Sequence, residues 1–387
     1  MNLVEFGFVY VGLLGLFIFI LLFGETPLFQ GTPVSFVHWL ITSGIWEGVW
    51  LVAGKICGNW GISALDKTQH ACCERSNPLL QIAYLLILMV AYYLYEREFL
   101  SMLPFPGIPA WHRWTALASV TTCLAVFLGT SASDPGTVTK ATLQRYSAMY
   151  QYDNVTCSRK VCDTCILLRP PRSKHCPACD RCVARFDHHC AWINSDVGLL
   201  NLRWFLLFLT CNLLLCIYGL CLGVSIVGGA LDRHQVRDMA FWDPSQDKWV
   251  VVGHQFRPLL EWALKMYSTG VTIMVFLGIA ALMMTCFLGY HLMLVARGMT
   301  TYETFKRRLW QEEATYAAEV EAADRYGMDD MRSVHDHSSG KTSGWVWWTW
   351  RRKRRKLVSI PPHLYSKGLM SNFWEVLFPL VPRSKLT

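Results

Sequence analysis

Five stretches of this chain are long and apolar enough to cross a lipid bilayer as helices. They are Leu3–Phe23, Leu79–Tyr95, Trp114–Thr130, Trp204–Gly228 and Thr269–Val295. A helix needs about 20 predominantly apolar residues to span the hydrocarbon core. Only 17% of the 387 residues are charged and 53% are hydrophobic, whereas about 25% of the residues of an average soluble domain are charged. The sequence therefore predicts an all-α polytopic membrane protein and argues against an ordinary soluble enzyme.

The N-terminal part of the chain leaves the number of spans open. Ser35–Ala53 is also apolar, but it contains His38, Glu47 and several Trp residues. We interpret it as an amphipathic or re-entrant helix in preference to a sixth span, because charge and Trp suit a helix that lies flat. Leu3–Phe23 is interpreted as an uncleaved anchor, since no Lys or Arg precedes it and no small-residue cleavage site follows. Five spans place the N terminus in the lumen, and six place it in the cytosol.

The distribution of Lys and Arg indicates which connections face the cytosol. Residues 131–203 contain ten of them, and the chain after Val295 contains sixteen. The connection between the second and third spans has two, and residues 229–268 have five, offset by five acids. Both span counts therefore place the Cys-rich region in the cytosol. The expected regions are an N-terminal transmembrane region 1–130, a cytosolic Cys-rich domain 131–203, two spans with a lumenal loop 204–295, and a cytosolic tail 296–387.

Seven of the 15 Cys residues lie close together, between Cys157 and Cys190. In the reducing cytosol, a dense cluster in a polar stretch indicates metal binding or catalysis rather than a disulfide framework. Cys-x2-Cys spacings recur in it beside a His, which is the pattern of tetrahedral zinc sites. The candidate ligands of this kind are Cys162, Cys165, His175, Cys176, Cys179 and Cys182. The segment has too little apolar content for a core, so bound metal would have to stabilise its fold.

The end of the cluster reads Asp187-His188-His189-Cys190, and it contains more than a zinc module needs. Asp187 beside His188 has the arrangement of an orienting carboxylate and a general base. Cys190 is the candidate nucleophile, because neighbouring cations or metal favour its thiolate. One alternative is that all these residues only bind zinc. A RING-type ligase is a second alternative, disfavoured because the terminal Cys-x2-Cys pair of that module is missing.

On these residues, the chain resembles the DHHC family of protein S-acyltransferases, the palmitoyltransferases. The similarity runs from Cys162 to Phe205 with the spacing of the family. Three further segments resemble its DPG, TTxE and C-terminal motifs: Asp134-Pro135-Gly136, Thr300-Thr301-Tyr302-Glu303 and Gly368–Asn372. The additional N-terminal segments differ from the common four-span plan and resemble a five-span subgroup of the family.

The resemblance divides the candidate zinc ligands into two sites. The first site takes Cys162, Cys165, His175 and Cys182, and the second takes Cys176, Cys179 and His189. The fourth ligand of the second site is a Cys in the family, but Asp196 stands at that position here. Ala191 and Ser195 also replace the usual Pro and Asn. A carboxylate oxygen can bind zinc, so we expect Asp196 to be a harder, weaker fourth ligand and the chain to hold two structural zinc ions.

The resemblance also implies a two-step acyl transfer. Cys190 attacks long-chain acyl-CoA, His188 accepts its proton and Asp187 holds the imidazole, and the acyl group then passes to a Cys of a substrate protein. Thr301 is expected to support Asp187, and Asn201 to connect the zinc module to the fourth span. Basic residues around the zinc ligands are either candidates to bind the CoA phosphates or ordinary residues of a cytosolic face. They are Lys160, Arg169, Arg172 and Lys174.

Other functions remain as alternatives. A zinc-containing membrane scaffold with weak or no turnover is raised by Asp196, whereas a transporter is disfavoured because the spans are nearly free of charge. Trp345–Lys356 combines Trp residues with six cations and suits an anionic leaflet, and nucleic-acid binding is disfavoured because no recognised fold accompanies the basic run. The expected partners are membrane lipid, acyl-CoA and substrate proteins with a juxtamembrane Cys. The expected location is the endoplasmic reticulum or Golgi membrane.

Overall fold

The computed structural model describes residues 31–69, 75–243, 247–254, 256–325 and 358–379, with isolated positions between 16 and 29. The chain divides into two compact units. The first comprises Met1–Val4, Arg75–Tyr302 and Leu364–Thr387, and the second comprises Glu5–Glu74 and Glu303–His363. All the candidate catalytic, metal-binding and supporting residues belong to the first unit.

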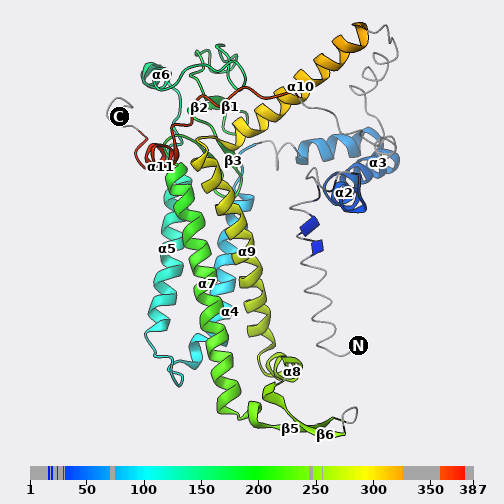
Figure 1. Ribbon diagram of the computed structural model, residues 1–387, viewed down its shortest axis with the longest axis vertical. Helices are drawn as coiled ribbons and strands as arrows, with labels where there is room; N and C mark the ends of the chain where they lie inside the picture. The colour runs from blue at the N-terminus through cyan, green and yellow to red at the C-terminus, as the bar shows by residue number, and fades with distance from the viewer. Residues whose placement is uncertain are drawn as a thin grey trace. The chain divides into compact units, whose positions relative to one another are not determined.

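Four long helices form a bundle in the first unit (Figure 1). They are α4 (Leu79–Glu98), α5 (His112–Ala132), α7 (Leu202–Arg233) and α9 (Ser268–Ala296). Each is long and apolar enough to cross a membrane. α7 has 32 residues, so it is about 48 Å long and extends beyond a hydrocarbon core of about 30 Å. These helices confirm the prediction of an all-α membrane protein and correspond to four of its predicted spans.

Small residues let the helices of this bundle approach closely. A Cβ added at Gly219 of α7 would lie 3.0 Å from Leu277 of α9, and one added at Gly223 would lie 3.1 Å from Met274. Close approach through small residues is a main source of helix association in lipid, where no hydrophobic force acts between helices. Tyr95 of α4 donates a hydrogen bond to the carbonyl of Gly219 at 2.7 Å. This contact and the two glycines fix α4 and α9 against α7.

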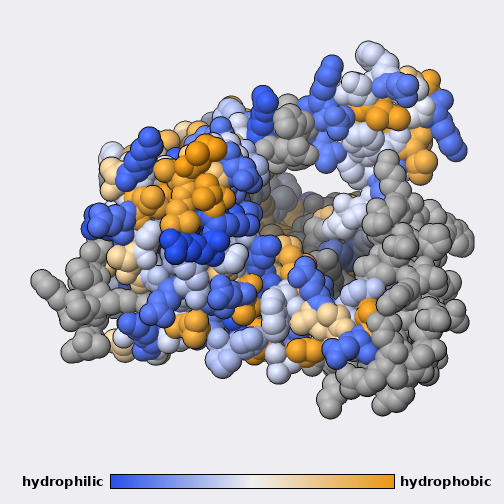
Figure 2. Space-filling view, turned by 90° about the horizontal axis from the view of Figure 1, so that it is seen from above, coloured by the Kyte–Doolittle hydropathy of each residue, from blue (hydrophilic) through white to orange (hydrophobic). Residues whose placement is uncertain are grey.

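Two short hairpins at one end of the bundle carry most of the clustered Cys and His residues (Figure 1). β1 (Lys174–Cys176) pairs with β2 (Arg181–Val183), and β3 (His188–Cys190) pairs with β4 (Ser195–Val197), both antiparallel. Such short isolated hairpins are not stable by themselves. α6 (Lys140–Ser147) packs on the first hairpin, where Tyr146 contacts a small buried cluster that includes Cys182. Seen face-on, this end of the unit is largely hydrophilic around an apolar patch (Figure 2).

The turn after α5 leads the chain into the hairpins. The Asp134 carboxylate accepts hydrogen bonds from the backbone N–H groups of Gly136 and Thr137, at 3.1 and 2.9 Å. Gly136 has a φ of +104°, a conformation that a side chain with a Cβ disfavours. The carbonyl of Gly136 then accepts a hydrogen bond from Ala184 at 2.9 Å. The Asp-Pro-Gly sequence therefore makes the tight turn that joins the bundle to the region of the metal ligands.

The opposite end of the bundle carries a third hairpin and short helices (Figure 1). These elements are η3 (Leu100–Met102), η4 (Val236–Asp238), β5 (Ala240–Asp243), β6 (Lys248–Val251), η5 (Val252–His254) and α8 (Phe256–Met266). A buried cluster around Phe99, Phe105 and Ile226 packs at this end. No candidate site residue lies among these described elements.

α11 (Leu369–Leu377) returns the C-terminal segment to the end of the bundle that carries the Cys-rich hairpins. Asn372 donates a hydrogen bond from Nδ2 to the carbonyl of Ala296, the last residue of α9, at 2.8 Å. Arg203 at the start of α7 donates to the carbonyl of Leu377 at 3.0 Å. The C-terminal motif thus ties together the ends of α7 and α9 beside the candidate site.

The second unit contains α2 (Pro33–Trp39), the π-helical turn η1 (Leu40–Gly44), α3 (Ile45–Gln69) and most of α10 (Thr301–Arg325). The helix predicted at Ser35–Ala53 is present, and it continues to Gln69 with a kink at Gly58, whose φ is +58°. Pro33–Gln69 is also long and apolar enough to cross a membrane, so its predicted placement at the membrane surface stays a prediction. The anchor Leu3–Phe23, apart from isolated positions, and the basic run Trp345–Lys356 lie outside the described residues.

Candidate active site and metal centres

Asp187 and His188 form a hydrogen-bonded pair at the start of the second hairpin. His188 Nδ1 lies 2.7 Å from Asp187 Oδ2. Thr301, the first residue of α10, donates its backbone N–H to Asp187 Oδ1 at 2.9 Å and its hydroxyl to Oδ2 at 3.0 Å. Cys190 lies on the same strand as His188, two residues further along the chain. The fold therefore brings Asp187, His188, Cys190 and Thr301 together at one place.

The charges of these groups depend on one another. Burial by itself would raise the pKa of Asp187, but the hydrogen bond with His188 and the charge of that ring bring it to about 2. Burial would lower the pKa of His188, yet its contacts with Asp187 and Cys190 raise it to about 10. Burial also opposes a thiolate at Cys190, but His188 brings the pKa of this thiol below its ordinary value. The arrangement favours a thiolate paired with an imidazolium, which is an activated nucleophile.

Cys190 faces the membrane helices. It is 7% exposed and belongs to a buried apolar cluster that includes Phe127 of α5, Phe205 and Phe208 of α7, and Val295 of α9. The Phe205 ring meets the His188 ring edge-on, with 5.2 Å between centroids. The nucleophile is therefore close to an apolar region at the end of the bundle rather than to open solvent.

His291 of α9 is part of the same site, and sequence analysis missed it. Its Nδ1 lies 3.9 Å from Asp187 Oδ2, and its ring centroid is 5.6 Å from that of His188. Phe205 and Phe287 pack edge-on against it, at 5.2 and 4.7 Å between centroids. The available signal was a His in a span that contains no Asp, Glu, Lys or Arg, because such residues normally face the interior of a bundle.

Cys162, Cys165, His175 and Cys182 converge on one point beside the first hairpin. Their ligand atoms all lie within 4.8 Å of one another. His175 Nδ1 is 3.3 Å from Cys165 Sγ and 3.9 Å from Cys182 Sγ. A tetrahedral zinc ion would place its nitrogen and sulfur ligands about 3.5 Å apart, given bonds of about 2.1 and 2.3 Å. The four donors therefore fit a structural zinc site.

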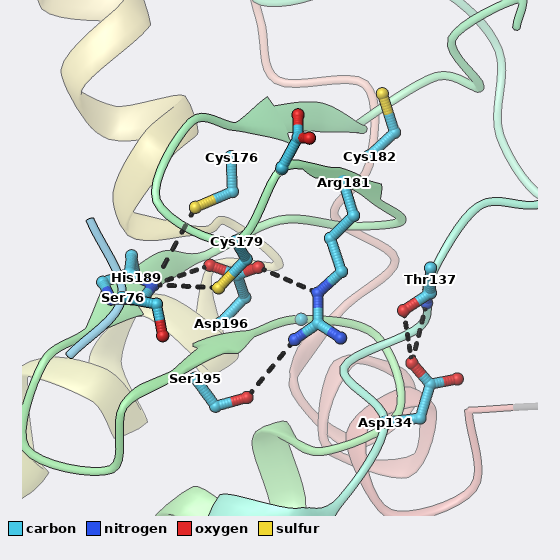
Figure 3. Close-up of polar contacts among 12 residues, drawn as sticks. Ser76, Asp134, Thr137, Cys176, Cys179, Arg181, Cys182, His189, Ser195 and Asp196 are labelled. Carbon is cyan, nitrogen blue, oxygen red and sulfur yellow. Dashed lines mark hydrogen bonds and ion pairs between the residues drawn. The ribbon is translucent and has the colours of Figure 1, made fainter. Parts of the chain in front are cut away.

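Cys176, Cys179, His189 and Asp196 form a second group within 4.8 Å, drawn from both hairpins (Figure 3). His189 Nδ1 lies 3.8 Å from Cys176 Sγ, 3.4 Å from Cys179 Sγ and 3.0 Å from Asp196 Oδ1. His189 and Asp196 are cross-strand partners of β3 and β4. Burial alone would raise the pKa of Asp196, but contacts with His189 and the two Cys residues lower it. An ionised Asp196 completes a donor set that fits zinc.

Asn201 is fully buried between the second hairpin and α7. Its Nδ2 donates a hydrogen bond to the carbonyl of Asp196 at 2.9 Å, and its Oδ1 accepts one from the N–H of Gly198 at 2.9 Å. Asn201 directly precedes α7. It therefore links the strand that carries Asp196 to the helix that enters the membrane.

The four basic candidates lie in different surroundings. Arg172 is buried, donates a hydrogen bond to the carbonyl of Gly298 at 2.9 Å, and packs on the rings of Tyr150 and Tyr365. Its guanidinium thus binds groups of the protein itself. Arg169 is partly exposed and donates a hydrogen bond to the carbonyl of Ser173 at 3.1 Å. Lys174 is partly exposed, with its Nζ 4.9 Å from the ring centroids of Phe186 and Tyr302, whereas Lys160 is exposed.

Glu375 of α11 was missed as well. Its carboxylate accepts a hydrogen bond from Tyr150 and lies 3.8 Å from Arg172 and 3.6 Å from Arg185. Both arginine side chains are 1% exposed. One carboxylate from the C-terminal segment therefore faces two buried cations of the Cys-rich region. The sequence signal was weak: Glu375 is the only acidic residue after Asp336.

Ser76 is a third residue of this region that sequence analysis missed. Its N–H donates to the carbonyl of Ala178, between Cys176 and Cys179, at 3.2 Å. Its hydroxyl donates to Asn194 Oδ1 at 2.7 Å, in the turn between β3 and β4. Ser76, just before α4, therefore binds the turns of both hairpins beside the donors of the second metal centre (Figure 3).

The amino-acid sequence is similar to those of known palmitoyltransferases. The family model for the DHHC palmitoyltransferase matches residues 155–308. The chain is similar to a Neurospora crassa protein named palmitoyltransferase SWF1, with 34% identity over 303 residues, which cover 76% of this chain and 69% of the relative. A Schizosaccharomyces pombe palmitoyltransferase swf1 is 26% identical over 377 residues, 95% of each chain. A Bos taurus palmitoyltransferase ZDHHC4 is 30% identical over 223 residues, 55% of this chain and 61% of the relative. Since the family model matches the Cys-rich region and the Neurospora relative is 34% identical over more than two thirds of both chains, the chain belongs to the DHHC palmitoyltransferase family.

Proposed function

We propose that this protein is an S-acyltransferase that moves a palmitoyl group from acyl-CoA to Cys residues of other proteins, through a thioester on Cys190. The observation that carries the proposal is the Asp187–His188 pair, at 2.7 Å, beside a buried Cys190 at the end of the membrane helices. Membership of the DHHC family supports the same activity.

In the first step, the Cys190 thiolate attacks the thioester carbonyl of the acyl-CoA. A new carbon–sulfur bond forms at Cys190, and the bond to the sulfur of CoA breaks. His188 holds the proton that Cys190 has given up and delivers it to the departing CoA thiolate. Asp187 keeps Nδ1 of His188 in a hydrogen bond, so that Nε2 serves Cys190. Thr301 keeps the carboxylate in place.

In the second step, the thiol of a substrate protein attacks the acyl-enzyme. His188 takes the proton of the incoming thiol, the acyl group moves to the substrate sulfur, and Cys190 leaves as a thiolate. The enzyme returns to its starting charge state. Both steps exchange one thioester for another, so no oxidant or further reactant is needed.

The apolar surroundings of Cys190 suit a lipid donor. Each methylene of a fatty chain that leaves water contributes about 0.8 kcal/mol. Phe127, Phe205 and Phe208 lie in the same cluster as Cys190, so a chain held among α5, α7 and α9 would present its thioester to the nucleophile. The partners expected from this placement are membrane lipid and substrate proteins whose Cys lies next to a membrane.

The CoA phosphates need cations near the entrance of the site. We assign Lys160, Arg169 and Lys174 to this role, because each is at least partly exposed and Lys and Arg are the usual phosphate ligands. Arg172, the fourth sequence candidate, is assigned to the protein interior because its guanidinium contacts Gly298 and Glu375.

Zinc is the proposed resident metal of both centres. Cys162, Cys165, His175 and Cys182 would hold one ion, and Cys176, Cys179, His189 and Asp196 the other. When bound, it would stabilise the two hairpins, which are too short to stand alone. The ten Lys and Arg of residues 131–203 support a cytosolic active site, and we place the protein in an endomembrane, the endoplasmic reticulum or Golgi.

Acyl labelling of the purified protein tests the function. Wild type and Cys190→Ser are incubated with labelled palmitoyl-CoA, and hydroxylamine then releases thioester-bound label. We expect label on wild type and none on Cys190→Ser. Cys157→Ser is the matched control, because Cys157 lies in the same region but belongs to neither donor group. Equal labelling of wild type and Cys190→Ser would refute the role of Cys190, and absence of label from wild type would favour the inactive scaffold.

A further inference from the structure

The two carboxylate oxygens of Asp196 face different partners. Oδ1 lies 3.0 Å from His189 Nδ1 and faces the other donors of the second metal centre, whereas Oδ2 lies 3.4 Å from Nε of Arg181 (Figure 3). Nη2 of Arg181 lies 3.5 Å from the hydroxyl of Ser195, on the same strand as Asp196. The Asp196 side chain is 0% exposed, whereas that of Arg181 is 33% exposed.

An Asp ligand needs a second partner that a Cys ligand at the same position would not need. A thiolate presents a single donor atom, and nothing remains unsatisfied after it binds metal. A carboxylate that binds through one oxygen leaves a second, partly charged oxygen. Leaving a buried acceptor unpaired costs about 1–3 kcal/mol, and more for a charged group. Oδ2 of Asp196 has no access to water, so the guanidinium of Arg181 must satisfy it.

Arg181 is well placed to do this. It lies on β2, where its backbone pairs with that of Cys176, a donor of the same centre. The nearby carboxylate of Asp134 is already engaged by Gly136 and Thr137, with 2.7 Å to the Thr137 hydroxyl. Figure 3 shows that turn on the other side of the guanidinium from Asp196. Arg181 is therefore available to Asp196.

We propose that Arg181 is a positioning residue for the second metal centre. It binds Oδ2 of Asp196 and so holds Oδ1 toward the metal, a support that a Cys ligand would not require. The proposal rests on the proposed zinc content of that centre. It predicts that the effect of substituting residue 181 on zinc retention depends on which residue stands at position 196. Partners that orient a metal ligand typically change metal affinity by about 10- to 100-fold, and this effect should exist only while residue 196 is Asp.

The experiment is a double-mutant cycle on the full-length purified protein. Wild type, Arg181→Gln, Asp196→Cys and the double variant are compared by zinc per chain and by the rate of zinc release to a coloured chelator. Arg181→Lys tests whether a cation without the planar guanidinium is enough. Arg145→Gln is the matched control, because Arg145 is an exposed residue of α6. The zinc of the first centre serves as an internal reference and shows that each variant is folded.

We expect wild type to hold close to two zinc ions per chain. Arg181→Gln should release one of them about 10- to 100-fold faster, with partial recovery in Arg181→Lys and no change in Arg145→Gln. In the Asp196→Cys background, Arg181→Gln should change the release rate by less than about threefold.

Three outcomes would overturn the proposal. They are unchanged release in Arg181→Gln, equal acceleration in both backgrounds, and a wild type that holds only one zinc ion. The last outcome would remove the second centre altogether. The proposed acyl transfer is tested separately, by labelling of Cys190 on the same preparation, so failure of either proposal can be told from failure of the other.

Discussion

The hydroxyl of Thr301 offers a sharp test of how Asp187 is held. It donates to Asp187 Oδ2 at 3.0 Å, while the backbone N–H of the same residue donates to Oδ1. Thr301→Val keeps the shape and the backbone bond and removes only the hydroxyl bond. A hydrogen bond to a charged group contributes about 1.5–3 kcal/mol, and Asp187 is buried, so water cannot replace the lost donor. If the full amount is felt in the transition state, self-acylation of Cys190 slows by about 10- to 150-fold.

The assay is single-turnover formation of the Cys190 thioester at saturating labelled palmitoyl-CoA. Thr301→Ser restores the hydroxyl and should recover most of the rate. Thr285→Val is the matched control, since the hydroxyl of Thr285 donates to the carbonyl of Ala281 within α9, away from Asp187. A wild-type rate in Thr301→Val, or a loss that Thr301→Ser does not recover, would refute the role of this hydroxyl.

The remaining predictions concern charge and burial around the same site. Because His188 lowers the pKa of the Cys190 thiol, alkylation of Cys190 should rise with pH through a midpoint below about 8.5, the value of a free thiol. His188→Ala should move that midpoint upward, and an unchanged midpoint would contradict the pairing. His291→Phe keeps the ring packing beside Asp187 but removes the imidazole, so we expect thioester formation to slow by about tenfold while zinc content stays unchanged; a normal rate would argue against any part for His291. Glu375→Gln leaves two buried arginines facing an uncharged group, which should lower the free energy of unfolding by about 3–5 kcal/mol, measured against the exposed control Glu261→Gln, for which about 0.5 kcal/mol or less is expected.

The membrane helices could be predicted from the sequence almost to their ends. Leu79–Tyr95 begins at the first residue of α4 and ends three residues before its last, and Trp114–Thr130 is the central part of α5. A bilayer demands a long apolar run whatever the neighbouring helices do. The Cys and His ligands could be recognised from their short spacings, but their division into two groups, and the place of Asp196 in the second, came from the resemblance to the DHHC family.

What sequence reasoning missed depends on contacts between distant parts of the chain. His291 is 104 positions from Asp187, and Glu375 is 190 positions from Arg185, so no local pattern joins them. The same limit applies to Arg172, which looked like a phosphate ligand until the fold placed it against Tyr150, Tyr365 and Glu375. A charge in a polar stretch shows its partner only when the tertiary structure is known.

The burial of Cys190 among the helices has a consequence for the lifetime of the intermediate. A thioester is an activated bond, and water would destroy it if the sulfur faced solvent. With Cys190 7% exposed and packed in one cluster with Phe127 and Phe205, the acylated form would be shielded from hydrolysis and would persist until a second thiol arrives. The enzyme could then be loaded in advance and respond at the rate at which substrate proteins diffuse past it in the membrane. The residues that contact the bound acyl chain could also vary, and change which fatty acids are accepted, without disturbing the Asp187–His188 pair at the end of the bundle.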